Sequence, residues 1–218
     1  MLKRNTECPT CKHQGSHEFS KDLKRIYRIC QNCSLVYVPR DSVVSEEEEK
    51  KRYEAHENDE LDPQYRAYLM NLVGLIMPEL RIGNLGLDFG CGKSTLLSQL
   101  FEEQGFKINS YDLYFHDHIE RLQIKYDFII LSEVIEHLRD PFDCMKHLVS
   151  FLNQKGKIII KTKFYPTDKA SFDNWFYKRD ITHIQFFNKS SMNHLISSIG
   201  VKNNFYELGE DVYCLHID

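Results

Sequence analysis

The sequence predicts an α/β protein: a doubly wound, mostly parallel sheet with a small cysteine-bearing module at its N-terminus. Three observations lead to this fold class. From residue 84 onward, strand-like and helix-like segments alternate, as they do when helical crossovers join parallel strands. Glycines follow the first of these strands, at the end of the sheet where such folds bind ligands. Two C-x-x-C pairs lie within the first 33 residues.

The length and composition are those of one main domain with a small addition. The chain has 218 residues, of which 42% are hydrophobic, so it can bury one substantial core. No stretch approaches the roughly 18 apolar residues that a membrane span needs. We therefore expect a cytoplasmic protein without a membrane partner. The sequence indicates no particular oligomeric state.

The net charge of −4 is unevenly distributed. Residues 1–45 carry eight basic and four acidic side chains, which gives +4 there and leaves −8 for the remainder. A basic module can contact phosphates, so RNA is one candidate partner; a solvated surface on a small domain is the simpler interpretation. The acidic remainder argues against binding along a long duplex.

The two C-x-x-C pairs predict a structural zinc site. Eighteen residues separate the pairs, the spacing of two knuckles that present four thiolates to one tetrahedral ion. Four thiolates saturate zinc and leave no position for water, so such a site stabilises the fold. A redox dithiol pair is the alternative, but no strand-to-helix setting accompanies either pair. The four expected ligands are Cys8, Cys11, Cys30 and Cys33.

The chain between this module and the sheet predicts two helices. Pro39 ends a short strand of the module. Ser45 precedes a run of acidic residues and is a suitable N-cap, and Asp62 with Pro63 begins an amphipathic helix. The expected domains are a zinc ribbon at 1–40, a helical linker and lid at 41–80, and the main domain at 81–218.

The glycine stretch GLDFGCGKSTLL, residues 86–97, could be read as a phosphate-binding loop. That motif, G-x-x-x-x-G-K-[ST], would need a glycine at position 87 if Gly92 preceded its lysine. Position 87 is leucine, and Gly86 is out of register. The register therefore favours another kind of cofactor loop.

Polar residues and glycines follow three of the expected strands, and they should gather at the carboxyl edge of the sheet. These residues are Asp88, Gly90 and Gly92 after the first strand, Asp112 after the second, and Ser132 and Glu133 after FIIL.

The segments LDFGCG and YDFIILSEVIEHLRDP resemble the signatures of class I S-adenosylmethionine-dependent methyltransferases, which have a Rossmann-like sheet. The resemblance covers about residues 65–218. It implies that the loop around Cys91 approaches the methionine part of the cofactor, that Asp112 accepts hydrogen bonds from the ribose hydroxyls, and that Ser132 and Glu133 lie at the cofactor. Zinc-bearing sugar methyltransferases similarly join a cysteine module to such a domain.

The sequence departs from that family pattern at two places. Ser94 stands where the loop often has a third glycine. Only 13 residues separate Asp112 from Tyr126, too few for the usual helix and strand together. We therefore expect a shortened sheet edge, and the adenine contact stays unassigned.

The segment EVIEH adds a group of acidic and histidine residues. Glu133, Glu136 and His137 are spaced to share one face of a helical turn. The motif resembles that of ubiquinone-pathway O-methyltransferases and of small-RNA 2′-O-methyltransferases, some of which use a divalent metal, so Mg²⁺ or Mn²⁺ is a candidate here. His183 could complete the site or act as a general base. A cofactor contact, a helix cap and a core histidine are the structural alternatives.

The aromatic segment FDNWFYKRDITHIQFF could line the substrate pocket, although core packing explains at least half of its rings. From it we assign Trp175, Tyr177 and Asp180 to substrate contacts. The predicted reaction is direct methyl transfer from S-adenosylmethionine to a small molecule at oxygen, with His183, Glu133 and His137 as catalytic candidates. An RNA methyltransferase that binds through the ribbon and a non-catalytic zinc adaptor are the alternatives.

Overall fold

The structure is a computed structural model that describes residues 7–55, 60–201 and 204–217. Its contacts divide the chain into two units. The ribbon unit comprises Met1–Glu49, Ile135–Lys146 and Thr162–Asn203. The sheet unit comprises Lys50–Val134, His147–Lys161 and Asn204–Asp218. Two segments from the C-terminal half of the chain thus belong to the unit of the cysteine module.

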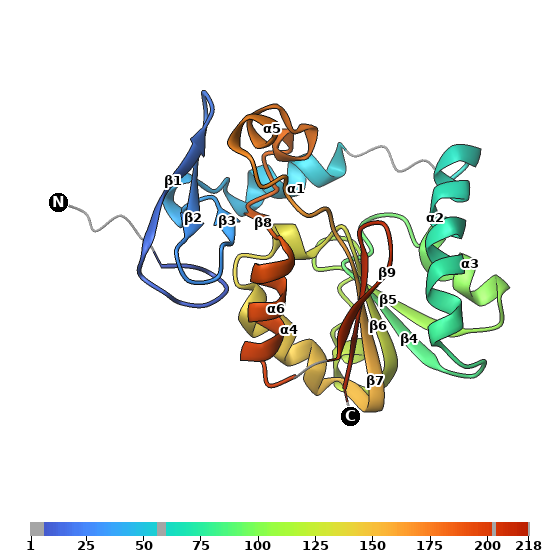
Figure 1. Ribbon diagram of the computed structural model, residues 1–218. Helices are drawn as coiled ribbons and strands as arrows, with labels where there is room; N and C mark the ends of the chain where they lie inside the picture. The colour runs from blue at the N-terminus through green and yellow to red at the C-terminus, as the bar shows by residue number, and fades with distance from the viewer. Residues whose placement is uncertain (1–6, 56–59, 202–203, 218) are drawn as a thin grey trace. The chain divides into compact units, whose positions relative to one another are not determined.

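A six-stranded sheet forms the centre of the sheet unit (Figure 1). Its strands are β4 (Leu85–Phe89), β5 (Lys107–Tyr111), β6 (Tyr126–Ser132), β7 (Leu152–Lys161), β9 (Phe205–Gly209) and β10 (Val212–His216). The order is β5-β4-β6-β7-β10-β9, and the first four strands are parallel. β10 runs antiparallel to both of its neighbours. The predicted fold class is confirmed, and β5 at the edge agrees with the shortened sheet expected from the short spacing after Asp112.

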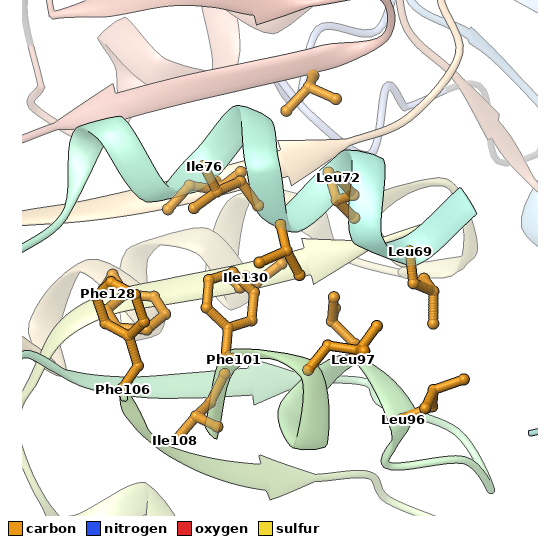
Figure 2. Packing of buried hydrophobic residues seen from close by; sticks show 14 residues of the cluster. Leu69, Leu72, Ile76, Leu96, Leu97, Phe101, Phe106, Ile108, Phe128 and Ile130 are labelled. Carbon is orange, nitrogen blue, oxygen red and sulfur yellow. The ribbon is translucent and has the colours of Figure 1, made fainter. Parts of the chain in front are cut away.

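Two helices of the sheet unit share one apolar core with the sheet. They are α2 (Pro63–Ile76) and α3 (Leu96–Glu103). The α2 helix begins as expected, because the Asp62 carboxylate accepts a hydrogen bond from the Gln64 amide at 2.9 Å. Figure 2 shows Leu72 and Ile76 of α2 beside Phe101 of α3 within this core. This packing fixes the sheet whose carboxyl edge carries the glycine loop after β4.

The ribbon unit contains a second, smaller sheet of order β1-β2-β3-β8. Its strands are β1 (Ser16–Lys21), β2 (Ile26–Cys30), β3 (Val36–Tyr37) and β8 (Gln185–Phe186). The first three come from the predicted ribbon, whereas β8 comes from a segment about 150 residues later and pairs antiparallel with β3. The unit also holds α5 (Lys169–Asn174) and α6 (Lys189–Ser198). Its core is rich in aromatic residues, Tyr27, Phe172 and Phe186 among them.

Two further helices, α1 (Glu46–Glu54) and α4 (Pro141–Ser150), each contain residues of both units. The α1 helix has a reciprocal cap: the Ser45 hydroxyl accepts from the Glu48 amide at 3.2 Å, and the Glu48 carboxylate accepts from the Ser45 amide at 3.1 Å. Among the described residues, no helix combines the length and the apolar character needed to cross a membrane.

Candidate functional site

The glycine loop after β4 contains two glycines with left-handed backbone conformations, Gly90 and Gly92. Gly90 has φ +77°, and a Cβ placed there would lie 2.7 Å from the Val134 side chain. Gly92 has φ +67°, but a Cβ there would meet no atom within 4 Å. Gly90 is therefore needed for packing inside the protein, whereas Gly92 presents its backbone to open space.

Asp112 follows β5 and is joined directly to this loop. Its carboxylate accepts hydrogen bonds from the amides of Gly92 at 3.0 Å, Tyr114 at 2.8 Å and Phe115 at 3.1 Å. The residue is half-buried. A carboxylate has about four acceptor positions, so Asp112 can still accept from a ligand. The loop and the acidic residue thus form one hydrogen-bonded arrangement.

Asp88 lies in β4 just before this loop, and Cys91 lies within it between the two glycines. Asp88 is 2% exposed, and its carboxylate accepts a hydrogen bond from Ser98 at 3.3 Å. Burial, together with the negative charge of Asp112, raises the pKa of Asp88 to about 7. Burial also raises the pKa of the Cys91 thiol, which makes it a poor nucleophile. The Asp88 side chain thus faces the interior beneath the loop.

Glu133 follows Ser132 at the end of β6 in a left-handed conformation, with φ +56°. Its amide donates to the carbonyl of Lys161 at 2.9 Å. The helical turn expected for EVIEH is a single 3₁₀ turn, Ile135–His137, which begins after Glu133. The prediction that Glu133 shares a helical face with Glu136 and His137 is therefore wrong, because the backbone reverses its helical sense at Glu133.

Glu136 is fully buried and hydrogen-bonded within the ribbon unit. Its carboxylate accepts from the Thr162 hydroxyl at 3.0 Å and from the Tyr177 hydroxyl. Buried carboxylates need such partners, because an isolated buried charge is costly. Two hydroxyl donors therefore fix both oxygens of Glu136.

His137 and His183 lie against each other, with ring centroids 4.6 Å apart. The Nδ1 atom of His137 is 3.0 Å from the Thr182 carbonyl, and that of His183 is 2.7 Å from the Tyr177 carbonyl. Because a carbonyl can only accept, each ring carries a proton on Nδ1, and the neutral form of either ring has its lone pair on Nε2. Burial, followed by the nearby His137, lowers the pKa of His183 to about 3.

Glu136, His137 and His183 therefore form a cluster that could hold a metal ion. One potential ligand atom from each lies within 4.8 Å of the other two. A divalent ion lies roughly 2.0–2.2 Å from nitrogen or oxygen ligands. Histidine ligands usually donate their second ring N–H to a carbonyl, as both rings do here. The cluster does not include Glu133.

Arg25 of the β1–β2 turn holds the loop that carries His183. It is 7% exposed, and its guanidinium donates to the carbonyls of Ile181 at 3.1 Å, His183 at 3.0 Å and Lys178. These are charge-assisted hydrogen bonds, which are about twice as strong as neutral ones. No sequence signal distinguishes Arg25 from the other basic residues of the module, so the sequence analysis missed this contact.

The three residues assigned to substrate contacts occupy different environments. Tyr177 is 5% exposed and donates to Glu136. Trp175 is partly buried and packs on the aromatic core of the ribbon unit. Asp180 accepts from the Thr182 amide at 2.9 Å and hydroxyl at 2.7 Å, so its side chain shapes the turn before His183. Thr162, which directly follows β7, is a further cluster residue that the sequence analysis missed.

The four predicted cysteine ligands converge in the ribbon unit. Their sulfur atoms lie within 4.8 Å of one another, with Cys8 and Cys33 at 3.6 Å and Cys11 and Cys30 at 3.5 Å. Four sulfurs about 2.3 Å from a tetrahedral zinc would lie roughly 3.8 Å apart. Lys12 and Ser34 follow the two pairs with φ +57° and +62°, so both knuckles turn alike. The cluster has the donors and the spacing of a zinc site.

A glycine loop bonded to an acidic residue, at the carboxyl edge of a mostly parallel sheet, defines the class of α/β cofactor-binding enzymes. Residues 61–204 match a family model described as a methyltransferase domain, and this match covers more than half of the chain. The protein therefore belongs to this family of methyltransferases, which confirms the predicted enzyme class.

Solved structures with a similar fold are also methyltransferases. One is the 1,6-didemethyltoxoflavin N1-methyltransferase of Burkholderia thailandensis, solved with that compound and S-adenosylhomocysteine; it has 12% identity and a TM-score of 0.55 over 93% of this chain and 99% of its own. Another is the magnesium protoporphyrin IX methyltransferase of Synechocystis PCC 6803, with 11% identity and a TM-score of 0.46 over 79% and 94%. A protein assigned as a methyltransferase from Bacillus halodurans C-125 has 16% identity and a TM-score of 0.49 over 65% and 70%. No curated protein sequence gives a significant match.

Proposed function

We propose that this methyltransferase uses S-adenosylmethionine and methylates a small molecule, with a hydroxyl oxygen as the acceptor. The observation that carries the cofactor assignment is the hydrogen bond between the Gly92 amide and Asp112. It joins an open glycine backbone, which an amino-acid group could approach, to a carboxylate, which can accept a hydrogen bond from a ribose hydroxyl. The Burkholderia relative supports the proposal, because the same fold accommodates S-adenosylhomocysteine there.

Residues of the sheet unit would then have separate roles. Asp112 would use its remaining acceptor position for a ribose hydroxyl, and the backbone at Gly90, Cys91 and Gly92 would approach the amino-acid part. Ser132 and Glu133 would lie along the same edge. When bound, the cofactor supplies a methyl group on a positively charged sulfur. The protein's contribution to the rate would be chiefly positioning, which removes the entropic cost of bringing two reactants together.

The burial of Arg25 removes one of the eight basic side chains of residues 1–45 from possible contact with RNA. This residue contributes to the basic charge of the ribbon, which was the feature that supported RNA binding. In the structure its guanidinium is buried against three carbonyls, so it is not available to phosphates. Trp175 and Tyr177 are candidates for contacts to an aromatic or apolar acceptor.

We further propose that Glu136, His137 and His183 hold a divalent cation. Their donor set is one carboxylate and two imidazoles, which suits manganese, iron or zinc better than magnesium, whose preferred ligands are oxygens. Such an ion lowers the pKa of a hydroxyl bound to it. A general-base role for His183 is less favoured, since a pKa of about 3 makes it a weak base near neutral pH. The four cysteines would hold a separate, structural zinc.

Calorimetry with S-adenosylhomocysteine tests the cofactor assignment. Asp112→Ala removes an acceptor for charged hydrogen bonds worth about 1.5–3 kcal/mol, so the dissociation constant should rise roughly 10- to 100-fold. Asp117→Ala, which removes an exposed carboxylate five residues later, is the matched control and should bind as the wild type does. Equal affinity of the wild type and the Asp112 variant would remove Asp112 from the site.

Metal analysis and turnover test the cluster. Wild-type protein that has lost the cluster ion by mild chelation but retains one zinc per chain by metal analysis should lose methyl transfer from S-adenosylmethionine to a library of hydroxylated compounds and regain it with Mn²⁺. Glu136→Gln removes the anionic ligand and should abolish this restoration while S-adenosylhomocysteine still binds. Glu18→Gln, an exposed change in the ribbon, is the control. Activity that survives chelation in the wild type would contradict a catalytic ion.

A further inference from the structure

Lys161, the last residue of β7, has a largely buried side chain, and no described carboxylate lies within hydrogen-bond distance of its ammonium group, which keeps some accessible surface. Its side chain is only 8% exposed. The nearest acidic oxygen, Oε1 of Glu133, lies 4.0 Å from Nζ, which is beyond a hydrogen bond. The ring of Tyr68 lies 5.4 Å from Nζ and covers it from α2. This environment is unusual, because buried ammonium groups are costly without full pairing.

The position of Lys161 in the sheet places this charge at the candidate site. Lys161 pairs in register with Ser132, and its carbonyl accepts from the Glu133 amide. The next residue, Val134, is the one that contacts Gly90 of the cofactor loop. Because β4, β6 and β7 are adjacent and parallel, their carboxyl ends lie about 4.8 Å apart along one edge.

We propose that Lys161 is an anion-binding residue of the methyl-transfer site, and that it pairs with a carboxylate presented at the ends of β6 and β7. A ligand carboxylate would supply the short, charged hydrogen bond that Glu133 does not. The Tyr68 ring would keep water from competing for the Lys161 ammonium group. Glu133, 4.0 Å away, adds an opposite charge, so the pair is also complementary to an amino acid that carries both charges.

Two sources could present this carboxylate: the methionine part of the cofactor or an acidic group of the methyl acceptor. The inference rests on the proposed cofactor, and two nucleosides separate the cases. S-Adenosylhomocysteine carries the aminocarboxylate, whereas 5′-methylthioadenosine lacks it. Acetate, added to protein saturated with S-adenosylhomocysteine, serves as the probe for an acceptor carboxylate.

The experiment measures binding of these three probes to the wild type and to Lys161→Met, which keeps the length of the side chain without its charge. If the source is the cofactor, affinity for S-adenosylhomocysteine should fall about 10- to 100-fold while that for 5′-methylthioadenosine is unchanged. If the source is the acceptor, both nucleosides should bind normally, and acetate binding to the wild-type complex should disappear in the variant. Lys161→Arg should restore either interaction in part.

Lys157→Met, in the middle of β7, is the matched control. Lys157 bonds to Glu79 at 2.6 Å, so this change should alter stability without altering the binding of any probe. Normal binding of both nucleosides by Lys161→Met, together with no acetate binding by the wild type, would overturn the proposal. A wild type that binds neither nucleoside would instead refute the proposed cofactor. Should Lys161→Met fail to fold, Lys161→Gln provides the same comparison.

Discussion

The two units of the molecule are stabilised in different ways. The sheet unit has a core of mostly aliphatic side chains from α2, α3 and neighbouring strands. The ribbon unit buries aromatic rings together with Arg25, Lys178, Glu136 and His183, and it contains both candidate metal clusters. Burial of apolar surface is non-directional, whereas buried polar groups require particular partners. The ribbon unit should therefore be far more sensitive to single polar substitutions.

Loss of a cysteine ligand should have the largest effect. Metal binding and folding are coupled in small zinc modules, and structural zinc is worth about 10–16 kcal/mol in isolated peptides. Cys30→Ser should lose one zinc per chain by metal analysis. Its hydrogen exchange should rise in β1, β2 and β3 and also in β8, which pairs with β3. Exchange in β4 and β6 should stay slow.

Cys144→Ser is the matched control for that experiment, because Cys144 lies in α4 and outside the four-cysteine cluster. It should keep the zinc and the slow exchange of β8. Fast exchange across both sheets in Cys30→Ser would contradict the separate stabilisation of the two units, since it would mean that they unfold as one cooperative structure.

Removal of Arg25 should have the next largest effect. Arg25→Ala leaves three carbonyls of the His183 loop without their donor, at a cost on the order of 3 kcal/mol in the free energy of unfolding. Affinity of the metal-depleted protein for Mn²⁺ should also fall, because the loop positions His183. Arg28→Ala is the control, since Arg28 bonds to Ser16 within the same hairpin. Equal Mn²⁺ affinity in the two variants would mean that Arg25 does not position the site.

The smallest effect, and the one that contrasts the units most directly, is their pH dependence. The folded pKa of His183 is about 3, below its ordinary 6.5, so the unfolded chain binds more protons and stability falls as pH drops below about 6.5. The folded pKa of Asp88 is about 7, above its ordinary 3.8, so its contribution is present in acid and is lost as pH rises towards 7. Each group changes stability by at most about 1.4 kcal/mol per pH unit.

Urea unfolding between about pH 4.5 and 7, with protein that keeps its ribbon zinc but has no added divalent ion, measures these slopes. His183→Asn should reduce the loss of stability that occurs as the pH falls below about 6.5. Asp88→Asn should reduce the opposite loss, which occurs as the pH rises towards 7. The same slope in both variants as in the wild type would show that neither residue keeps its buried environment in solution.

The sequence predicted the sheet unit better than the ribbon unit, because the elements of the sheet unit have local sequence signals and the contacts of the ribbon unit join distant residues. Buried runs such as Phe128–Leu131, the capped start at Asp62 and the glycines before Asp112 are local signals, and each leads to its element without reference to the rest of the chain. The contact of Arg25 with the His183 loop joins residues more than 150 positions apart, and no periodicity records it. The pairing of β8 with β3 has only two residues in each strand, which is too short to predict.

In the candidate site, too, some features follow from local sequence signals and others do not. Glu136 and His137 are adjacent in the sequence, and His183 lies within reach of a shared ion with them. Glu133 was placed with them because a regular helix was assumed; its positive φ removes it from that turn. Local spacing therefore predicts a site only where the backbone conformation is also regular.

The burial of the remaining thiols has a practical consequence for chemical labelling. Burial raises the pKa of Cys91, Cys144 and Cys214, to about 12 for Cys144, so these thiols stay protonated near neutral pH. Alkylating reagents attack thiolates, and they should therefore react slowly at all three positions in the folded protein. Rapid alkylation would then occur only at the four-cysteine cluster. The amount of alkyl group added, measured by absorbance or mass, would therefore report whether the ribbon is folded.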